Sequence, residues 1–398
     1  MGKQITLLIK QMVGGGAERV ISLLSNSFAE RDYDTTLIIT HQSLKDADLT
    51  NIQKNIRTIS LEDEITRESK NLKRFLMLKT RLVGKFDRTV FRKSDDRFLI
   101  KKYEVRNYDK VQYLKKYFTR NQENIIVAFL NDSIFLTLLS AQKRDRVIIS
   151  ERSDPSQSVS SKTNMAFFRT MYDRADQIVF QSSDVMQWYN DRIQVEGRVI
   201  FNPLKPDLPG RFIGLRKKRI VNFCRISKEK NLHLLITSFG KFSKDFPEYE
   251  LWIYGDAVGE SSQRYIEKVK QAINQLDCKN QIHILPAQQD IHHLIRDYAM
   301  FVSSSDFEGM SNSMLEAMAI GLPTICTDCP AGGARAVIQD HENGILVSVN
   351  DEETLCKAMC EVAENPELAE KLSINGTKIR DDLAVDKIVK QWMEIINV

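Results

Sequence analysis

The chain has 398 residues, enough for two to three domains of roughly 150 residues each, which excludes a single small module. Hydrophobic residues make up 42% of it, as in ordinary folded proteins, and this excludes disordered, collagen-like and coiled-coil chains. The net charge of +4 is too small to require nucleic acid as a partner.

The N-terminal half of the sequence alternates apolar runs with helical periods. Strands are expected at residues 4–10, 35–40, 124–130, 147–150, 177–180 and 198–200. This alternation is typical of β-α-β units and predicts a parallel sheet that ends near residue 200. Pro203, Pro206 and Pro209 then interrupt it, and we interpret this stretch as a linker because closely spaced prolines neither continue a helix nor donate to a strand ladder.

The same alternation restarts after the linker. Further strands are expected at residues 219–224, 250–255, 281–285, 300–305, 323–326 and 344–347. The sequence therefore predicts two α/β domains, at 1–202 and 207–383, with the helix at 384–398 packing back on the first. Ligands bind beyond the carboxyl ends of parallel strands, so two such sheets facing each other would enclose a ligand cleft.

Residues 67–120 differ from the rest of the chain in charge. They contain 18 Lys or Arg and 6 Asp or Glu, with nine Phe or Tyr interleaved, and their net charge is +12 against −8 elsewhere. One interpretation is a solvated helical face whose aromatic side chains enter the core. The other is a surface that contacts anionic lipid or a lipid-phosphate acceptor. We expect no nucleic acid here, since no recognised binding motif accompanies the charge.

A glycine-rich loop follows the first predicted strand and opens a helix. Gly14, Gly15 and Gly16 stand where backbone amides and the helix dipole favour an anion, and their lack of side chains lets a ligand approach the main chain. The loop is not G-x-G-x-x-G and the second strand ends without an acidic residue, which disfavours a dinucleotide-dependent oxidoreductase. A tight turn without a ligand remains the alternative.

Two carboxylates flank the start of the helix predicted near Ser311. Glu308 precedes this helix and Glu316 lies within it. The backbone amides of Met310, Ser311 and Asn312 are expected to point out of the helix N-terminus toward a phosphate, while the carboxylates accept hydrogen bonds from sugar hydroxyls.

Two cations lie in the turn after the strand predicted at 219–224. Arg225 and Lys230 fall at the same carboxyl edge of the sheet, so both can reach one diphosphate. The alternative is an ordinary run of surface charge.

Together these segments resemble a known family. The loop at 14–16, Arg225 with Lys230, Tyr-Gly-Asp at 254–256 and EGMSNSMLEAMAIGLPTI at 308–325 are similar to the retaining, nucleotide-sugar-dependent glycosyltransferases of family 4, which have the GT-B fold. The resemblance implies two Rossmann-like domains. It also implies transfer of a hexose or N-acetylhexosamine from a nucleotide-diphosphate sugar, with UDP favoured, with retention of configuration and without a metal or other cofactor.

The acceptor is suggested by a further segment. DCPAGGARAVI, which begins at Asp328, resembles members that build bacterial polysaccharides and glycolipids. The implied acceptor is a lipid-linked saccharide or polysaccharide of the bacterial cell surface. The six cysteines and the absence of a secretory leader indicate a reducing compartment, so we expect a cytoplasmic protein, peripheral at the inner face of the plasma membrane through 67–120.

The resemblance also implies roles for individual residues. Glu316 would bind the ribose hydroxyls and Glu308 would face the transferred sugar. Arg225 and Lys230 would bind the diphosphate, over which the glycine-rich loop with Gly15 and Gly16 would close from the other domain.

Several positions depart from the family pattern, among them Cys224, Ala257 and Pro286-Ala287, which stand where glycine often occurs, and one strand end of the first domain. The histidine that often ends a strand of the first domain is missing, and Glu151 and Arg152 stand in the equivalent segment. We expect these two residues on the acceptor side. A noncatalytic nucleotide-binding or sugar-binding regulatory protein with the same two-domain shell remains the alternative function.

Overall fold

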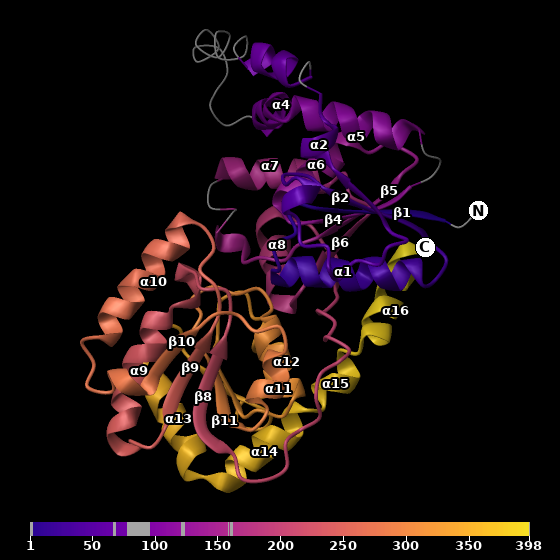
Figure 1. The fold of residues 1–398 in the computed structure, drawn as a ribbon. Coiled ribbons are helices and arrows are strands. Elements are labelled where there is room, and N and C mark those ends of the chain that lie inside the picture. Colours follow the sequence, from indigo (N-terminus) through magenta and orange to yellow (C-terminus); the bar gives the residue numbers. More distant parts are fainter. Residues whose placement is uncertain are drawn as a thin grey trace. The chain divides into compact units, whose positions relative to one another are not determined.

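The computed structural model describes residues 3–66, 69–77, 96–120, 124–157, 159 and 162–397. The chain forms two compact units (Figure 1). The N-terminal unit comprises residues 1–200 and 389–398, and the C-terminal unit comprises residues 201–388.

The described part of the N-terminal unit contains a seven-stranded parallel sheet in the order β3-β2-β1-β4-β5-β6-β7. The strands are β1 (Gln4–Ile9), β2 (Asp34–Ile39), β3 (Arg57–Ser60), β4 (Ile125–Phe129), β5 (Arg146–Ser150), β6 (Gln177–Phe180) and β7 (Arg198–Val199). All but β3 were predicted from apolar runs. β3 is a four-residue edge strand that begins on the exposed Arg57, so its sequence has too few apolar residues to show a pattern.

Helices flank this sheet. They include α1 (Gly16–Ala29), α2 (Leu61–Glu64), α4 (Asp96–Arg106), α5 (Tyr108–Arg120), α6 (Asn131–Ser140), α7 (Lys162–Tyr172), α8 (Ser183–Ile193) and, from residue 389 on, α16 (Val385–Ile396). α1 buries Val20, Ile21, Leu24 and Phe28, the helical spacing that a core-facing stripe requires. α16 buries Trp392, whose ring stacks on Phe129 of β4 at 5.9 Å between centroids.

The C-terminal unit has a second parallel sheet, in the order β10-β9-β8-β11-β12-β13. Its strands are β8 (Lys217–Phe223), β9 (Glu250–Tyr254), β10 (Ile282–Leu285), β11 (Tyr298–Ser303), β12 (Thr324–Thr327) and β13 (Ile345–Val347), and each was predicted. Its helices are α9 (Leu232–Asp245), α10 (Glu260–Ile273), α11 (Ile291–Ile295), α12 (Asn312–Ala319), α13 (Glu352–Glu364), α14 (Pro366–Gly376) and α15 (Ile379–Asp382).

The strand order brings two strand ends together that are distant in the sequence. On one side β8 pairs with β9, the next strand in the sequence. On its other side β8 pairs with β11, where Val221 lies opposite Phe301 in register. The strand order therefore reverses between β8 and β11, which is where open parallel sheets bind ligands.

The basic stretch is only partly covered by the described residues. Residues 67–68 and 78–95, which include Phe86 and Phe91, lie outside them. In the described portion of the chain, the helices are all too short or too polar to cross a membrane.

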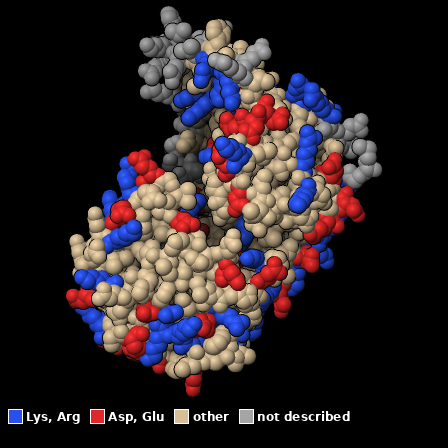
Figure 2. All heavy atoms as spheres, in the orientation of Figure 1, with Lys and Arg blue, Asp and Glu red and all other residues tan. Residues whose placement is uncertain are grey.

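The described side chains of this stretch fit both interpretations of it. Tyr103 packs edge-on against Phe135, with 5.5 Å between ring centroids, as expected of an aromatic that enters the core. Lys110 is buried and its ammonium lies 2.8 Å from the Glu62 carboxylate. Phe75, in contrast, is 63% exposed. Basic and acidic side chains are interspersed on the face seen in Figure 2.

Candidate active site

The turns that follow β8 and β11 are tied together by hydrogen bonds. The Asp306 backbone N–H donates to the carbonyl of Glu229 at 2.9 Å. The Ser304 hydroxyl lies 3.0 Å from the carbonyl oxygens of both Lys230 and Asn231. The loop that carries Glu308 is thereby fixed against the turn that carries the two predicted cations.

Lys230 and Glu308 form an ion pair across these two loops. Both side chains are mostly buried, with 14% of Lys230 and 24% of Glu308 exposed. The Ser305 hydroxyl lies 3.5 Å from the same Glu308 oxygen. Burial alone would lower the pKa of Lys230, but Glu308, Cys224 and Glu229 together outweigh it and the pKa is raised. The ammonium therefore remains charged at the edge of the sheet.

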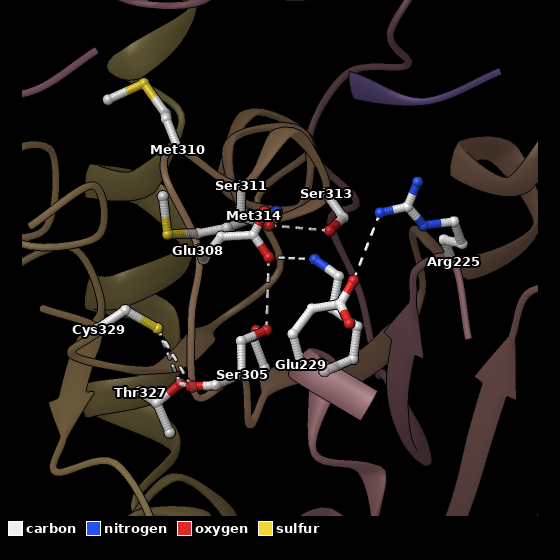
Figure 3. Close-up of polar contacts among 12 residues, drawn as sticks. Arg225, Glu229, Ser305, Glu308, Met310, Ser311, Ser313, Met314, Thr327 and Cys329 are labelled. Carbon is white, nitrogen blue, oxygen red and sulfur yellow. Dashed lines mark hydrogen bonds and ion pairs between the residues drawn. The ribbon is translucent and has the colours of Figure 1, made fainter. Parts of the chain in front are cut away.

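Arg225 lies in the same turn but in a different environment. Its side chain is 53% exposed, and its guanidinium is 3.4 Å from the Glu229 carboxylate (Figure 3). An exposed pair at this distance contributes little to stability, so the guanidinium can move to a bound anion at small cost. The two predicted cations thus share one turn, but the Lys230 side chain is mostly buried and the Arg225 side chain is exposed.

α12 begins where a helix was predicted, near Ser311. Ser311 is the N-cap, and its hydroxyl accepts a hydrogen bond from the backbone N–H of Met314 at 3.4 Å. Met310 is buried, and the Asn312 side-chain oxygen accepts a hydrogen bond from Asn202 at 2.8 Å. One pocket brings part of this helix start together with Glu308. It is lined by Ser303, Ser305, Glu308, Ser311, Met314, Cys326, Thr327, Cys329 and Ala334.

Glu316, the second predicted carboxylate, lies apart from Glu308. It is 3% exposed, and its Oε2 atom lies 2.9 Å from Nε2 of His292. It does not line the pocket with Glu308. The sequence offers no local signal for the contact with His292, because the two residues are 24 positions apart on different helices.

Two glycines allow the site loops to pack closely. A Cβ atom at Gly333 would lie 1.7 Å from the carbonyl oxygen of Gly309, next to Glu308 in the sequence. A Cβ atom at Gly255 would lie 1.9 Å from the carbonyl oxygen of Cys224, which precedes Arg225. Both contacts are with backbone, so a larger residue must displace a loop of the site.

The thiols near the pocket are buried and retain their protons. Burial raises the pKa of Cys329 to about 12, and it raises the pKa of Cys326 as well. The Cys329 thiol donates to the carbonyl of Ser305 at 3.1 Å. Among the residues that the structure describes, no three His, Cys, Asp or Glu are grouped so that they could hold a metal ion.

The glycine-rich loop lies at the end of β1 in the N-terminal unit. Gly15 is the N-cap of α1, which begins at Gly16, and Gly14 has a φ of +78°. A Cβ atom at Gly15 would lie 2.3 Å from the buried Glu18 carboxylate. The role of Gly15 and Gly16 toward a diphosphate stays a prediction.

Glu151 and Arg152 directly follow β5 and are buried. The Tyr172 hydroxyl donates to Glu151, while the Arg152 guanidinium lies 4.4 Å from the ring centroid of Phe129 and 5.9 Å from that of Trp392. Burial raises the pKa of Glu151 to about 8 and lowers that of Arg152 to about 9. Their placement on the acceptor side stays a prediction.

The two units, each a Rossmann-like parallel sheet, define the GT-B fold of glycosyltransferases, and the predicted fold class is confirmed. Residues 211–379 match the family described as glycosyl transferases group 1. This match confirms the resemblance inferred from the sequence.

Curated relatives match by sequence to different extents. An uncharacterized glycosyltransferase of Haemophilus influenzae is 25% identical over 182 residues, which are 46% of this chain and 50% of the relative. This chain thus spans about half the length of that relative, as it does for one from Methanocaldococcus jannaschii. A Campylobacter jejuni enzyme, GalNAc-alpha-(1->4)-GalNAc-alpha-(1->3)-diNAcBac-PP-undecaprenol alpha-1,4-N-acetyl-D-galactosaminyltransferase, is 23% identical, with 99% of this chain and 98% of the relative covered.

Solved structures resemble the whole chain. Sucrose-phosphate synthase from Thermosynechococcus elongatus has a TM-score of 0.77 at 15% identity, covering 99% of this chain and 98% of the other. Anabaena Alr3699/HepE in complex with UDP and glucose has a TM-score of 0.74 at 17% identity, covering 99% of each chain. At these identities the likeness shows the fold alone.

Proposed function

We propose that this protein is a retaining glycosyltransferase that transfers a hexose or N-acetylhexosamine from a nucleotide-diphosphate sugar, with UDP favoured, to a lipid-linked or polysaccharide acceptor. The reaction contributes to the biosynthesis of bacterial cell-surface polysaccharides. The observation that carries the proposal is the Lys230–Glu308 pair at the strand edge where β8 and β11 meet, in a segment of the glycosyl transferases group 1 family. The lipid-linked substrate in the name of the Campylobacter relative supports the acceptor class.

The chemistry follows from where charge develops. Cleavage of the donor's glycosidic bond leaves negative charge on the departing diphosphate and positive charge on the anomeric carbon. Lys230, Arg225 and the amides at the start of α12 stabilise the diphosphate, because they are charged or polarised before the reaction and need little reorganisation. Glu308 accepts hydrogen bonds from the sugar and lies on the side of the developing positive charge.

Each of the two predicted cations is paired with a carboxylate. Glu308 pairs with Lys230, and Glu229 pairs with Arg225. A diphosphate carries more charge than either carboxylate and accepts bidentate hydrogen bonds from a guanidinium, so it competes for both cations. Donor binding therefore releases Glu308 from Lys230 and leaves it available to the sugar.

Retention follows if the acceptor hydroxyl attacks the face that the diphosphate leaves, with a departing phosphate oxygen as the base. The same proposal needs no metal or other cofactor. Gly15 and Gly16 contact the diphosphate, and Glu316 binds the ribose. Glu151 and Arg152 act toward the acceptor. The basic stretch at 67–120 contacts an anionic membrane from the cytoplasmic side.

Nucleotide binding is the first test. UDP and other nucleoside diphosphates are added in a thermal-shift experiment, where a ligand at 100 times its Kd adds about 2.7 kcal/mol of stability. We expect UDP to raise the melting temperature and free sugar to leave it unchanged. Stabilisation by free sugar without any nucleotide would favour the noncatalytic sugar-binding protein instead.

Transfer is the second test. Radiolabelled sugar nucleotides are incubated with the protein and bacterial membrane fractions, and the lipid phase is counted. Label in the lipid phase supports the lipid-linked acceptor and the membrane contact. Transfer to a soluble acceptor at the same rate with and without membranes contradicts both.

A further inference from the structure

Two adjacent histidines of α11 have opposite environments. The His292 side chain is 7% exposed, and its Nε2 atom lies 2.9 Å from Oε2 of Glu316 on α12. The His293 side chain is 54% exposed and pairs with Asp290 at 2.6 Å. Only His292 therefore contacts a residue that the proposed function places at the nucleotide.

The ring of His292 is held by the central strands of the sheet. It packs edge-on against Phe223, the last residue of β8, with 5.7 Å between centroids and 89° between the ring planes. Phe223 in turn packs against Phe301 of β11 at 5.2 Å. The imidazole thus has a position defined by β8 and β11, the two strands whose ends carry the proposed diphosphate site.

The chemistry of the pair sets the direction of its hydrogen bond. A carboxylate can only accept, so the imidazole Nε2 carries the hydrogen and donates it to Glu316. A buried carboxylate is stabilised by such a donor, and the bond also restricts rotation of the carboxylate about its last torsion. Glu316 is therefore presented in one orientation.

We propose that His292 is a positioning residue that orients Glu316 for the ribose hydroxyls of the nucleotide. This inference rests on the proposed function and adds to it a residue outside the 308–325 motif. His292 acts through Glu316, so its loss weakens ribose recognition and leaves the diphosphate contacts of Arg225 and Lys230 in place.

The test compares UDP with 2′,3′-dideoxy-UDP, which keeps the base and diphosphate but lacks both ribose hydroxyls. Affinities are measured by calorimetry for the wild type, Glu316→Gln, His292→Leu, His292→Gln and the matched control His293→Gln. We expect the wild type to prefer UDP and Glu316→Gln to lose that preference. His292→Leu should weaken UDP binding about tenfold, equal to about 1.4 kcal/mol, with the affinity for the dideoxy compound unchanged.

His292→Gln and His293→Gln test whether the loss comes from the hydrogen bond to Glu316. His292→Gln retains an amide donor and should recover part of the preference, while His293→Gln should behave as the wild type. Should His292→Leu fail to fold, a reduced preference in His292→Gln carries the inference and an unchanged one overturns it. In steady-state kinetics, the KM for the donor should rise with kcat nearly unchanged, since the ribose contact exists in both ground and transition states.

Three results would overturn the inference. An equal loss of affinity for both compounds in the His292 variants would show general damage to the site. A preference unchanged from the wild type would show that His292 does not orient Glu316. Absence of UDP binding by the wild type would overturn the proposed UDP donor, and the inference with it, whereas the first two results leave that donor intact.

Discussion

Lys230 and Arg225 show how two similar residues in one turn acquire different roles from their surroundings. Lys230 is held in the wall of the site by Glu308, whereas Arg225 is half exposed and contacts Glu229 only at 3.4 Å. A fixed ammonium is suited to a site that must be charged before the ligand arrives. The exposed guanidinium of Arg225 can move with the diphosphate as that group departs.

Removal of either cation should reduce catalysis. Arg225→Ala and Lys230→Ala should each cost about 3 to 4 kcal/mol of transition-state stabilisation, because each removes a preorganised donor to the leaving diphosphate. The measurement is kcat/KM with the best donor found. Lys228, exposed in the same turn, provides the control, and Lys228→Ala should leave kcat/KM close to the wild-type value. An Arg225→Ala enzyme with unchanged turnover would contradict the assignment.

Glu151 should make stability depend on pH. Its pKa is raised by burial from 4.5 to about 8, so the folded state holds the proton over a range in which the unfolded chain has lost it. Its contribution to stability is complete below about pH 4.5 and is lost as the pH rises through about 8.

Glu151→Gln isolates this effect, because glutamine has nearly the same shape and does not titrate. The melting temperature of the variant minus that of the wild type should increase between pH 5 and pH 8.5. Both proteins retain Arg152, so its own titration cancels in the difference. A difference that stays constant over this range would show that Glu151 is ionised in the folded protein.

At the scale of elements, the loop between β11 and α12 depends on its contact with a neighbouring segment. Gly333 touches the backbone of Gly309, and a Cβ atom there would lie 1.7 Å from the carbonyl oxygen. Such a clash is relieved only by movement of backbone, and Glu308 lies on the segment that must move.

Gly333→Ala should therefore reduce both stability and activity. We expect a loss of about 1 to 3 kcal/mol in the free energy of unfolding, as for other overpacked sites, and at least a tenfold fall in kcat/KM. The control is Gly210→Ala, because a Cβ atom at Gly210 meets open space. Wild-type activity in Gly333→Ala would show that the loop tolerates the displacement.

The strands illustrate which elements a sequence pattern can predict. β11 is buried and apolar over most of its length, and β8 is buried from Ile220 to Phe223, so each was predicted from its residues alone. β3 was missed because it is a short edge strand with an exposed first residue, held in place by its pairing with β2.

At the scale of the whole molecule, the C-terminal end of the chain packs in the N-terminal unit. Residues 389–398 belong to the N-terminal unit, where Trp392 is fully buried and stacks on Phe129. The Arg146 guanidinium also donates to the carbonyl of Ile395 from two nitrogens, at 3.1 and 2.8 Å. These contacts make the last helix part of the N-terminal core.

Trp392→Ala should destabilise the N-terminal unit. Removal of a buried aromatic side chain costs about 3 to 5 kcal/mol, which combines lost burial with the cavity left behind. Urea unfolding followed by far-UV circular dichroism measures the change. Gln391→Ala, exposed on the same helix, should lie within about 0.5 kcal/mol of the wild type. A similar loss of stability in both variants would show that the substitutions act on the helix as a whole and not through burial of the Trp392 side chain.

The sequence by itself determined the two α/β units, the strands with apolar runs and the similarity of residues 211–379 to the glycosyl transferases group 1 family, because hydrophobic periodicity and the motif at 308–325 are local properties of the chain. Only the tertiary structure decided which residues the strand order brings together. Lys230 meets Glu308 across 78 positions and His292 meets Glu316 across 24. No local pattern encodes such contacts. The first depends on β8 and β11 becoming neighbours when the sheet forms, and the second joins two different helices, α11 and α12.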